Sequence, residues 1–267
     1  MIHTILNISA GGQTAPLYTY MLDTPEALNN GKPRPVVLIL PGGAYRRTSD
    51  REAEPIAIRM NAAGFHAAIL RYSVAPVRFP VALLQAAQAV MLLREHAEEW
   101  HIDPRRVFVM GFSAGGHLAA SLGTLLNKKI IDDELKADPA RFRPDGLLLA
   151  YPVITSGEFA HQGSIDNLIG EKAELKEIVS LEKQVDKDTP PAFIWHTGED
   201  GSVPVENSLL FAEALRRSGV SFELHIYRKG VHGLSLANKE TESSNCPTPF
   251  PGVDSWIDLA LNWLQGF

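Results

Sequence analysis

The feature that most constrains the fold is a Gly-x-Ser-x-Gly motif formed by Gly111, Ser113 and Gly115. The apolar run that precedes it, residues 107–110, is typical of a strand buried on both faces. The small and apolar residues 114–122 that follow predict a helix. A strand that turns sharply into a helix strains the serine backbone, and glycines two residues to either side avoid a collision there. The motif therefore predicts an exposed serine hydroxyl at the end of a strand.

Apolar runs and helical patterns alternate along the rest of the chain. We expect strands at residues 2–8, 17–22, 36–40, 65–72, 147–151, 192–196 and 222–227. Helices are expected at residues 51–63, 80–97, 205–218 and 256–264. This alternation predicts an α/β fold with a mostly parallel sheet and helices on both faces, in which ligands bind at the carboxyl ends of the strands.

We expect one domain spanning residues 1–267, because the length and the composition suit a single large core. A polar insertion, residues 153–189, separates two of the predicted strands. It is the one obvious segment for a short cap or lid. Its many charges favour an exposed, polar cover, which disfavours a long-chain lipase.

The charge pattern argues against nucleic acid as a partner. The net charge is -6, and the longest basic clusters are arginine pairs such as Arg46-Arg47. No apolar run approaches the roughly 18 residues of a membrane span, and no signal peptide precedes the first strand. We therefore expect no membrane partner and a cytoplasmic location. Assembly into a homo-oligomer stays open.

The single cysteine, Cys246, lies in a polar, proline-rich stretch. It permits no intrachain disulfide, and we expect a passive surface thiol. Metal and nucleotide chemistry find no support. The pair His96 and His101 lacks the spacing of a zinc helix, and no glycine loop ends in Gly-Lys-Ser or Gly-Lys-Thr. We expect no metal and no cofactor.

A serine hydroxyl becomes a strong nucleophile only when an imidazole takes its proton and an acid orients that imidazole. In this fold the acid and then the histidine follow the serine along the chain. Asp200 and its neighbour Glu199 lie just past the strand at residues 192–196. His232, in a loop after the last strand, is the histidine that best fits the base by position.

Backbone N–H groups must also face the charge that develops on a carbonyl oxygen. Two segments are placed to supply them. One is the N–H of Ala114, directly after Ser113. The other is the loop at residues 41–44, which ends the strand at residues 36–40. Tyr45 follows that loop, and it either lines the substrate pocket or packs on the loop as a surface aromatic residue.

Several segments resemble the α/β-hydrolase serine esterases related to hormone-sensitive lipase, and within them the bacterial acetyl-xylan-esterase-like group. The resemblance is carried by PGGAY, by RYSVAP at residues 71–76, by DPRRVFVMGFSAGGHLA, by DTPPAFIWHTGEDGSVP and by VHGLSLAN. It implies Ser113 as nucleophile, Asp200 rather than Glu199 as acid, and His232 as base. It also implies Gly43, Ala44 and Ala114 as oxyanion donors.

The chain departs from the wider lipase group in the oxyanion segment, where Pro41 replaces the histidine of HGGG and Ala44 replaces the third glycine. The resemblance implies a serine carboxylesterase that acts on small esters with short acyl groups, such as acetylated xylo-oligosaccharides. Two alternatives stay open. One is a peptidase or arylformamidase with the same triad, and the other is a catalytically inactive binding protein with a hydrolase fold.

Overall fold

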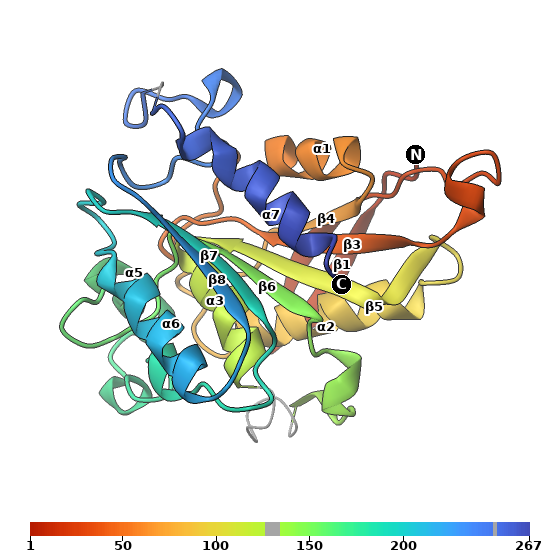
Figure 1. Cartoon of the computed structure of the whole chain (residues 1–267). Coiled ribbons are helices and arrows are strands. Elements are labelled where there is room, and N and C mark those ends of the chain that lie inside the picture. Colours follow the sequence, from red (N-terminus) through yellow and green to blue (C-terminus); the bar gives the residue numbers. More distant parts are fainter. Residues whose placement is uncertain (126–133, 248–249) are drawn as a thin grey trace.

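The computed structural model describes residues 1–125, 134–247 and 250–267 (Figure 1). One eight-stranded sheet organises the fold, in the order β1-β2-β4-β3-β5-β6-β7-β8. The first two strands form an antiparallel hairpin, β2 also runs antiparallel to β4, and the remaining neighbours pair in parallel. The mostly parallel sheet predicted from the alternating pattern is confirmed.

The strands are β1 (Ile5–Ala10), β2 (Gln13–Tyr20), β3 (Arg34–Leu40), β4 (His66–Leu70), β5 (Ile102–Phe112), β6 (Gly146–Ala150), β7 (Ala192–Thr197) and β8 (Phe222–Tyr227). The helices are α1 (Glu54–Ala62), α2 (Val81–Glu95), α3 (Ala114–Thr124), α5 (Gln162–Ile169), α6 (Glu206–Arg217) and α7 (Trp256–Leu264).

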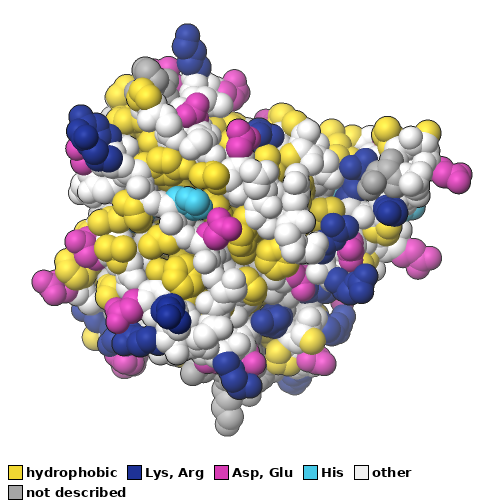
Figure 2. All heavy atoms as spheres, viewed as in Figure 1, with side chains coloured by type: hydrophobic (Ala, Val, Ile, Leu, Met, Phe, Trp, Pro, Cys, Tyr) yellow, Lys and Arg dark blue, Asp and Glu magenta, His cyan; other side chains and the backbone are white. Residues whose placement is uncertain are grey.

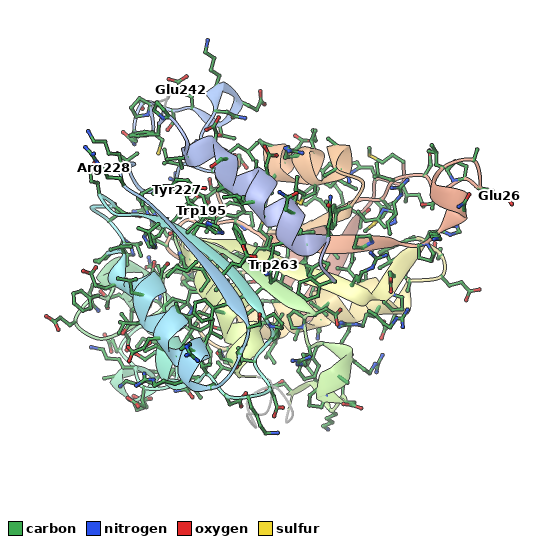
Figure 3. The ribbon with its side chains drawn as sticks, viewed as in Figure 1. Glu26, Trp195, Tyr227, Arg228, Glu242 and Trp263 are labelled. Carbon is green, nitrogen blue, oxygen red and sulfur yellow. The ribbon has the colours of Figure 1, made fainter. Side chains whose placement is uncertain are left out.

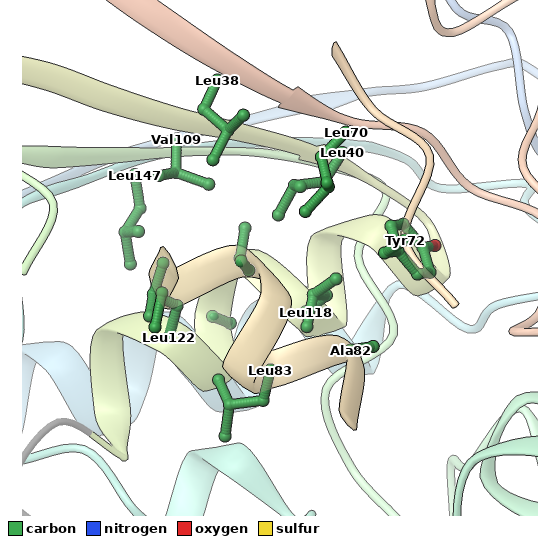
Figure 4. Packing of buried hydrophobic residues seen from close by; sticks show 14 of the residues in the cluster. Leu38, Leu40, Leu70, Tyr72, Ala82, Leu83, Val109, Leu118, Leu122 and Leu147 are labelled. Atoms are coloured by element: carbon green, nitrogen blue, oxygen red, sulfur yellow. The ribbon is translucent and has the colours of Figure 1, made fainter. Parts of the chain in front are cut away.

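Helices cover both faces of the sheet, as predicted. Helices α2, α3 and α6 lie on one face and α1 and α7 on the other, and each set contributes to a separate apolar cluster (Figure 1). Figure 4 shows part of the first cluster, where Leu118 and Leu122 of α3 lie on the same side of the sheet as Leu40 of β3 and Leu147 of β6. A fully buried leucine contributes about 2 kcal/mol through removal of its surface from water. Burial on both sides explains why the central strands are continuous apolar runs.

Aromatic packing fixes the C-terminal helix on the sheet. Trp195 of β7 and Trp256 of α7 stack with ring centroids 5.0 Å apart, and Trp263 lies 6.1 Å from Phe193. Figure 3 shows Trp195 and Trp263 between the strands and α7. The apolar stripe at residues 256–264 therefore packs against the sheet, as its helical spacing predicts.

The surface mixes charges of both signs. On the face drawn in Figure 2, acidic and basic side chains are interspersed around hydrophobic patches. Within the described ranges, no helix combines the length and the apolar character needed to cross a membrane.

Some element boundaries differ from the prediction for identifiable reasons. Strand β5 begins at Ile102, five residues before the apolar run, because residues 102–106 continue beside β3 across a bulge between Arg34 and Val36. Helix α1 begins at Glu54 and not at residue 51, because Arg51 instead bonds to distant backbone carbonyl groups. The first hairpin is also shifted, to β1 and β2 as given above.

The insertion at residues 153–189 is less exposed than predicted. Its charged side chains do face solvent in the segment around Glu174, but its apolar residues join the core. Helix α5 buries Ile165 and Leu168, and the following segment buries Val179 and Leu181. The prediction was based on the many charged residues of the insertion. It missed the buried apolar residues because they are spaced singly among the charged ones. The insertion thus packs on the body of the protein, and the division of residues 1–267 as a single domain stays a prediction.

One buried histidine links the fold to pH. His66 of β4 accepts a hydrogen bond from the N–H of Leu22 at Nδ1 and donates from Nε2 to the carbonyl of His101. Both bonds suit the neutral ring. Burial, with a contribution from the nearby Arg34, lowers the pKa of His66 to about 4. The folded state therefore resists protonation of this ring.

We expect the free energy of unfolding to fall as the pH drops from 6.5 to 4, because the unfolded chain binds a proton on His66 before the folded chain does. The contribution of His66 is fully present above pH 6.5 and is lost by pH 4, at about 3 kcal/mol in total. Urea unfolding at several pH values should show a shallower loss in His66→Asn than in the wild type. His117, whose pKa is also lowered to about 4, leaves a residual slope in both proteins. Identical slopes in the two proteins would contradict the prediction.

Candidate active site

Ser113 occupies a strained turn between β5 and α3. Its backbone has φ 53° and ψ -117°, a region that residues with a side chain rarely adopt. Such a conformation costs about 1–3 kcal/mol and persists only where the surroundings impose it. Here the carbonyl of Ser113 accepts from the N–H groups of His117 and Val153, and its own N–H donates to Ala150. The side chain is 7% exposed and reaches a cavity at the carboxyl ends of the strands.

The two glycines of the motif are required by close backbone contacts. A Cβ on Gly111 would overlap the carbonyl group of Gly115, and a Cβ on Gly115 would overlap the carbonyl oxygen of Leu40. Helix α3 can therefore begin directly against the ends of β3 and β5. This explains why the turn takes glycine at both positions.

The structure brings the three residues expected as a triad into one hydrogen-bonded chain. His232 Nε2 lies 2.8 Å from Ser113 Oγ, and His232 Nδ1 lies 2.7 Å from Asp200 Oδ2. Asp200 follows β7 and His232 follows β8, so the parallel sheet places both loops beside the serine turn. Glu199, the rival acid, is exposed to solvent.

Asp200 is held as a carboxylate by several donors. The N–H groups of Ser202 and Val203 both donate to its Oδ1 at 2.9 Å, and His196 Nε2 lies 3.3 Å from Oδ2. Burial acts to raise the pKa of Asp200, but the bonds from His196 and His232 outweigh it and hold the pKa below its ordinary range. A charged acceptor at this position fixes the proton of His232 on Nδ1 and leaves Nε2 free to accept from the serine.

The loop after β3 presents free N–H groups to the same cavity. Its carbonyl oxygens are occupied: Gly43 accepts from Arg46, and Ala44 accepts from Asn167 of α5 at 2.9 Å. Among the described residues, no acceptor bonds to the N–H of Gly43, Ala44 or Ala114. All three residues are at the cavity or directly beside Ser113. Such unpaired donors are what an oxyanion requires.

Glu52 connects this loop to the loop that carries the histidine. Its buried carboxylate accepts from the N–H of Gly42 at 2.8 Å and from the hydroxyl of Tyr151 at 2.7 Å. The same hydroxyl accepts from the N–H of Ser235, three residues after His232. The ring of Tyr151 lies 5.1 Å from that of His232. One carboxylate thus positions both sides of the serine.

The cavity has a volume of about 420 Å³ and opens beside Ser113 and His232. Its lining is polar: arginine, serine, histidine and asparagine side chains predominate, and within the described residues no leucine, isoleucine, valine or aromatic side chain other than His161 and His232 contributes. No large apolar side chain of the described residues is therefore placed to receive a long acyl chain. The space suits a small, polar ligand.

Tyr45 is not placed as the sequence led us to expect. Its side chain is buried, 2% exposed, and does not line the cavity. The hydroxyl donates to His117 Nδ1 at 2.9 Å, and His117 Nε2 donates to the carbonyl of Val179 in the insertion. A positive φ of 54° turns the Tyr45 backbone so that the ring enters the core beside α3. Tyr45 therefore anchors the oxyanion loop from behind.

Cys246 is also placed differently from the expectation. It is 5% exposed, and its Sγ contacts the carbonyl oxygens of His232 and Gly233 at 3.1 and 3.5 Å. The polar composition of its loop concealed that the loop folds back onto the active site. Across the described residues, no cluster of three or more histidine, cysteine or acidic side chains has the arrangement of a metal site.

Several residues at the site escaped sequence reasoning. Arg51 and Glu52 lie in what was predicted to be a helix, and His161 and Asn167 lie in the insertion. His161 caps α5 through Ser164 and borders the cavity. Only the proximity of residues 51 and 52 to the oxyanion segment offered a signal. The other two residues reach the site through tertiary packing.

The sheet, the serine turn and the histidine loop define an α/β hydrolase. The BD-FAE family model matches residues 22–215. The chain therefore belongs to the BD-FAE family.

Relatives and solved structures agree with this assignment. The chain is 38% identical over 218 residues to endo-1,4-beta-xylanase B of Butyrivibrio fibrisolvens, covering 79% of this chain and 34% of that protein. It is 29% identical to an acetylxylan esterase of Xylanibacter ruminicola, covering 97% of this chain and 50% of that protein. The chain thus spans half or less of these two relatives.

A solved structure offers a match over comparable lengths. The acetyl ester-xyloside bifunctional hydrolase of Caldicellulosiruptor lactoaceticus has a TM-score of 0.81 and 39% identity, covering 95% of this chain and 88% of that chain. The predicted α/β-hydrolase fold and its resemblance to the acetyl-xylan-esterase-like group are thereby confirmed.

We expect Gly115→Ala to destabilise the protein strongly, because its Cβ would overlap the backbone of β3. Overpacking of this kind costs about 1–3 kcal/mol or more, since backbone has to move. The matched control is Gly201→Ala, where the added Cβ meets no atom within 4 Å. Thermal unfolding should show a melting temperature several degrees lower, or insoluble protein, for Gly115→Ala alone. Equal melting temperatures for both variants would refute the close contact.

Proposed function

We propose that the chain is a serine carboxylesterase that releases short acyl groups, above all acetyl, from small polar alcohols such as xylo-oligosaccharides. The observation that carries the proposal is the chain of hydrogen bonds from Ser113 through His232 to Asp200 at a polar cavity. Family membership and the names of the acetylxylan esterase and the acetyl ester-xyloside hydrolase support the substrate class.

The geometry leads to a two-step reaction. Ser113 Oγ attacks the acyl carbon while its proton passes to His232 Nε2, and Asp200 stabilises the resulting imidazolium. The carbonyl oxygen becomes an oxyanion that faces the N–H groups of Gly43, Ala44 and Ala114. The bond to the alcohol then breaks, and the alcohol oxygen takes the proton from Nε2. Water attacks the acyl-enzyme by the same route and regenerates Ser113.

The size and polarity of the cavity favour short acyl groups. A hydrophobic chain gains about 0.8 kcal/mol for each buried CH₂ only where apolar surface receives it. The described lining has small residues, serine hydroxyls and guanidinium groups but no leucine, isoleucine or valine side chain. These groups suit the hydroxyls of a sugar. The cytoplasmic location expected from the sequence stays a prediction, as does any assembly of copies.

The direct test is acetate release from an acetylated xylo-oligosaccharide, measured beside 4-nitrophenyl acetate and butyrate. We expect Ser113→Ala to lose at least a thousandfold in kcat with a melting temperature close to the wild type, because the hydroxyl is the reacting group. We also expect acetate to exceed butyrate in kcat/KM. Serine-independent hydrolysis, or activity only on amide or formamide substrates, would overturn the proposal.

Glu52 provides a second test of the same site. In Glu52→Gln only one oxygen remains to accept from Gly42 and Tyr151, so the oxyanion loop loses part of its support. We expect kcat on 4-nitrophenyl acetate to fall about tenfold to a hundredfold, which is below the cost of deleting an oxyanion donor outright. Glu54→Gln, two residues further along the chain, is the control. An unchanged kcat in Glu52→Gln would show that the loop does not depend on this carboxylate.

A further inference from the structure

Three arginines border the cavity without a carboxylate partner. Arg46 and Arg47 follow the oxyanion loop, and Arg51 is bonded to Gly233 of the histidine loop. Within the described part of the chain, the guanidinium groups of Arg46 and Arg47 form no ion pair or hydrogen bond. Charged side chains without an ion-pair partner are common at a protein surface. Three of them beside one cavity indicate a place where an anion could bind.

Two of the three nitrogen atoms of the Arg51 guanidinium have a hydrogen-bond acceptor among the described residues. Its Nε and Nη1 donate to the carbonyl oxygens of Thr241 and Gly233 at 2.6 and 2.9 Å. Its Nη2 is buried and has no acceptor among the described residues. A buried donor on a charged group without a partner is costly. Arg51 therefore lines the cavity with a guanidinium group whose hydrogen-bonding capacity the described residues do not fully use.

The acidic groups nearby are already engaged. The carboxylate of Glu52 is 4% exposed and accepts from Gly42 and Tyr151. Asp50 is paired with Arg71 at 2.7 Å. The described lining combines the guanidinium groups of Arg46, Arg47 and Arg51 with one carboxylate, that of Glu52, so its formal charge is positive although the whole chain has a net charge of -6. This local reversal of sign favours an anion at the cavity.

The position of Arg51 indicates which part of the ester the anion belongs to. His232 Nε2 hands its proton to the leaving oxygen, so the alcohol lies on the side of the histidine loop. Arg51 is bonded to Gly233, the residue after His232. The hydroxyls of Ser49 and Ser202 complete a lining suited to a sugar.

We propose that Arg46, Arg47 and Arg51 bind a carboxylate on the alcohol part of the ester, so that the preferred substrates are short acyl esters of acidic alcohols, such as acylated oligosaccharides that carry a uronic acid. This inference rests on the proposed esterase function and narrows its substrate class. Guanidinium groups bind carboxylates through paired, charge-assisted hydrogen bonds, which makes arginine the suitable residue.

The test compares two substrates that differ in one charge: 4-acetoxybenzoate and its neutral methyl ester. The measured quantity is the ratio of their kcat/KM values, each divided by the rate of alkaline hydrolysis. We expect the wild type to favour the anion and the ratio to fall at least tenfold in the double variant Arg46→Ala/Arg47→Ala. The preference should also weaken as salt is raised.

The matched control is Arg216→Ala/Arg217→Ala, an adjacent pair of exposed arginines on α6 outside the cavity lining. It changes the net charge by the same amount and should keep the wild-type ratio. An equal fall in both double variants, or no fall in either, would overturn the proposal. Arg51→Gln, compared by the same ratio, extends the test to the arginine beside the histidine loop.

Binding separates this inference from the proposed function. Titration calorimetry of the Ser113→Ala variant with 4-acetoxybenzoate and with the methyl ester requires no turnover. Tighter binding of the anion, weakened by Arg46→Ala/Arg47→Ala, would support the carboxylate site even if the wild type hydrolysed neither ester. Equal binding of both compounds beside active hydrolysis would reject the carboxylate site and leave the esterase intact.

Discussion

The close approach of three backbone segments around Ser113 is the constraint on which the site depends. The end of β3, the end of β5 and the start of α3 meet at distances that only glycine at positions 42, 111 and 115 permits. This contact forces the positive φ of Ser113 and places the N–H of Ala114 beside the loop that holds Gly43. The same backbone packing therefore positions the Ser113 side chain and the N–H groups of Gly43 and Ala114, the groups proposed as nucleophile and oxyanion donors.

The remaining parts of the site reach this contact through the sheet. Strands β7 and β8 continue the parallel order beyond β6, so the loops with Asp200 and His232 emerge at the same edge as the serine turn. The insertion then braces the oxyanion loop at two points, through Asn167 on the carbonyl of Ala44 and through the chain from Tyr45 to Val179. The first contact holds a backbone carbonyl of the loop and the second holds the side chain of Tyr45, so neither uses the N–H groups of the loop. The insertion therefore acts on the site as a support.

Sequence patterns predicted the parts of this arrangement that depend on local chemistry and strand order. The Gly-x-Ser-x-Gly turn, the central apolar strands and the loops of Asp200 and His232 follow from residue type and position along the chain. Tyr45 and Cys246 were misplaced, because burial depends on how a loop folds back and not on its composition. Arg51 and Glu52 were assigned to a helix for the same reason. Their side chains bond to backbone groups of Gly233 and Gly42, contacts that sequence spacing alone does not reveal.

Carboxylates and guanidinium groups occupy different places in the site. Carboxylates act inside the framework: Asp200 holds the imidazole, and Glu52 ties the oxyanion loop to Tyr151, and both are nearly removed from solvent. Guanidinium groups face the open cavity, where Arg46 and Arg47 meet no carboxylate among the described residues. A buried acid with its hydrogen bonds complete has no capacity left for a ligand, whereas an unpaired guanidinium keeps all its donors. The buried carboxylates therefore position the framework of the site, whereas the groups with hydrogen-bonding capacity left for a ligand at the cavity are the arginines and hydroxyls.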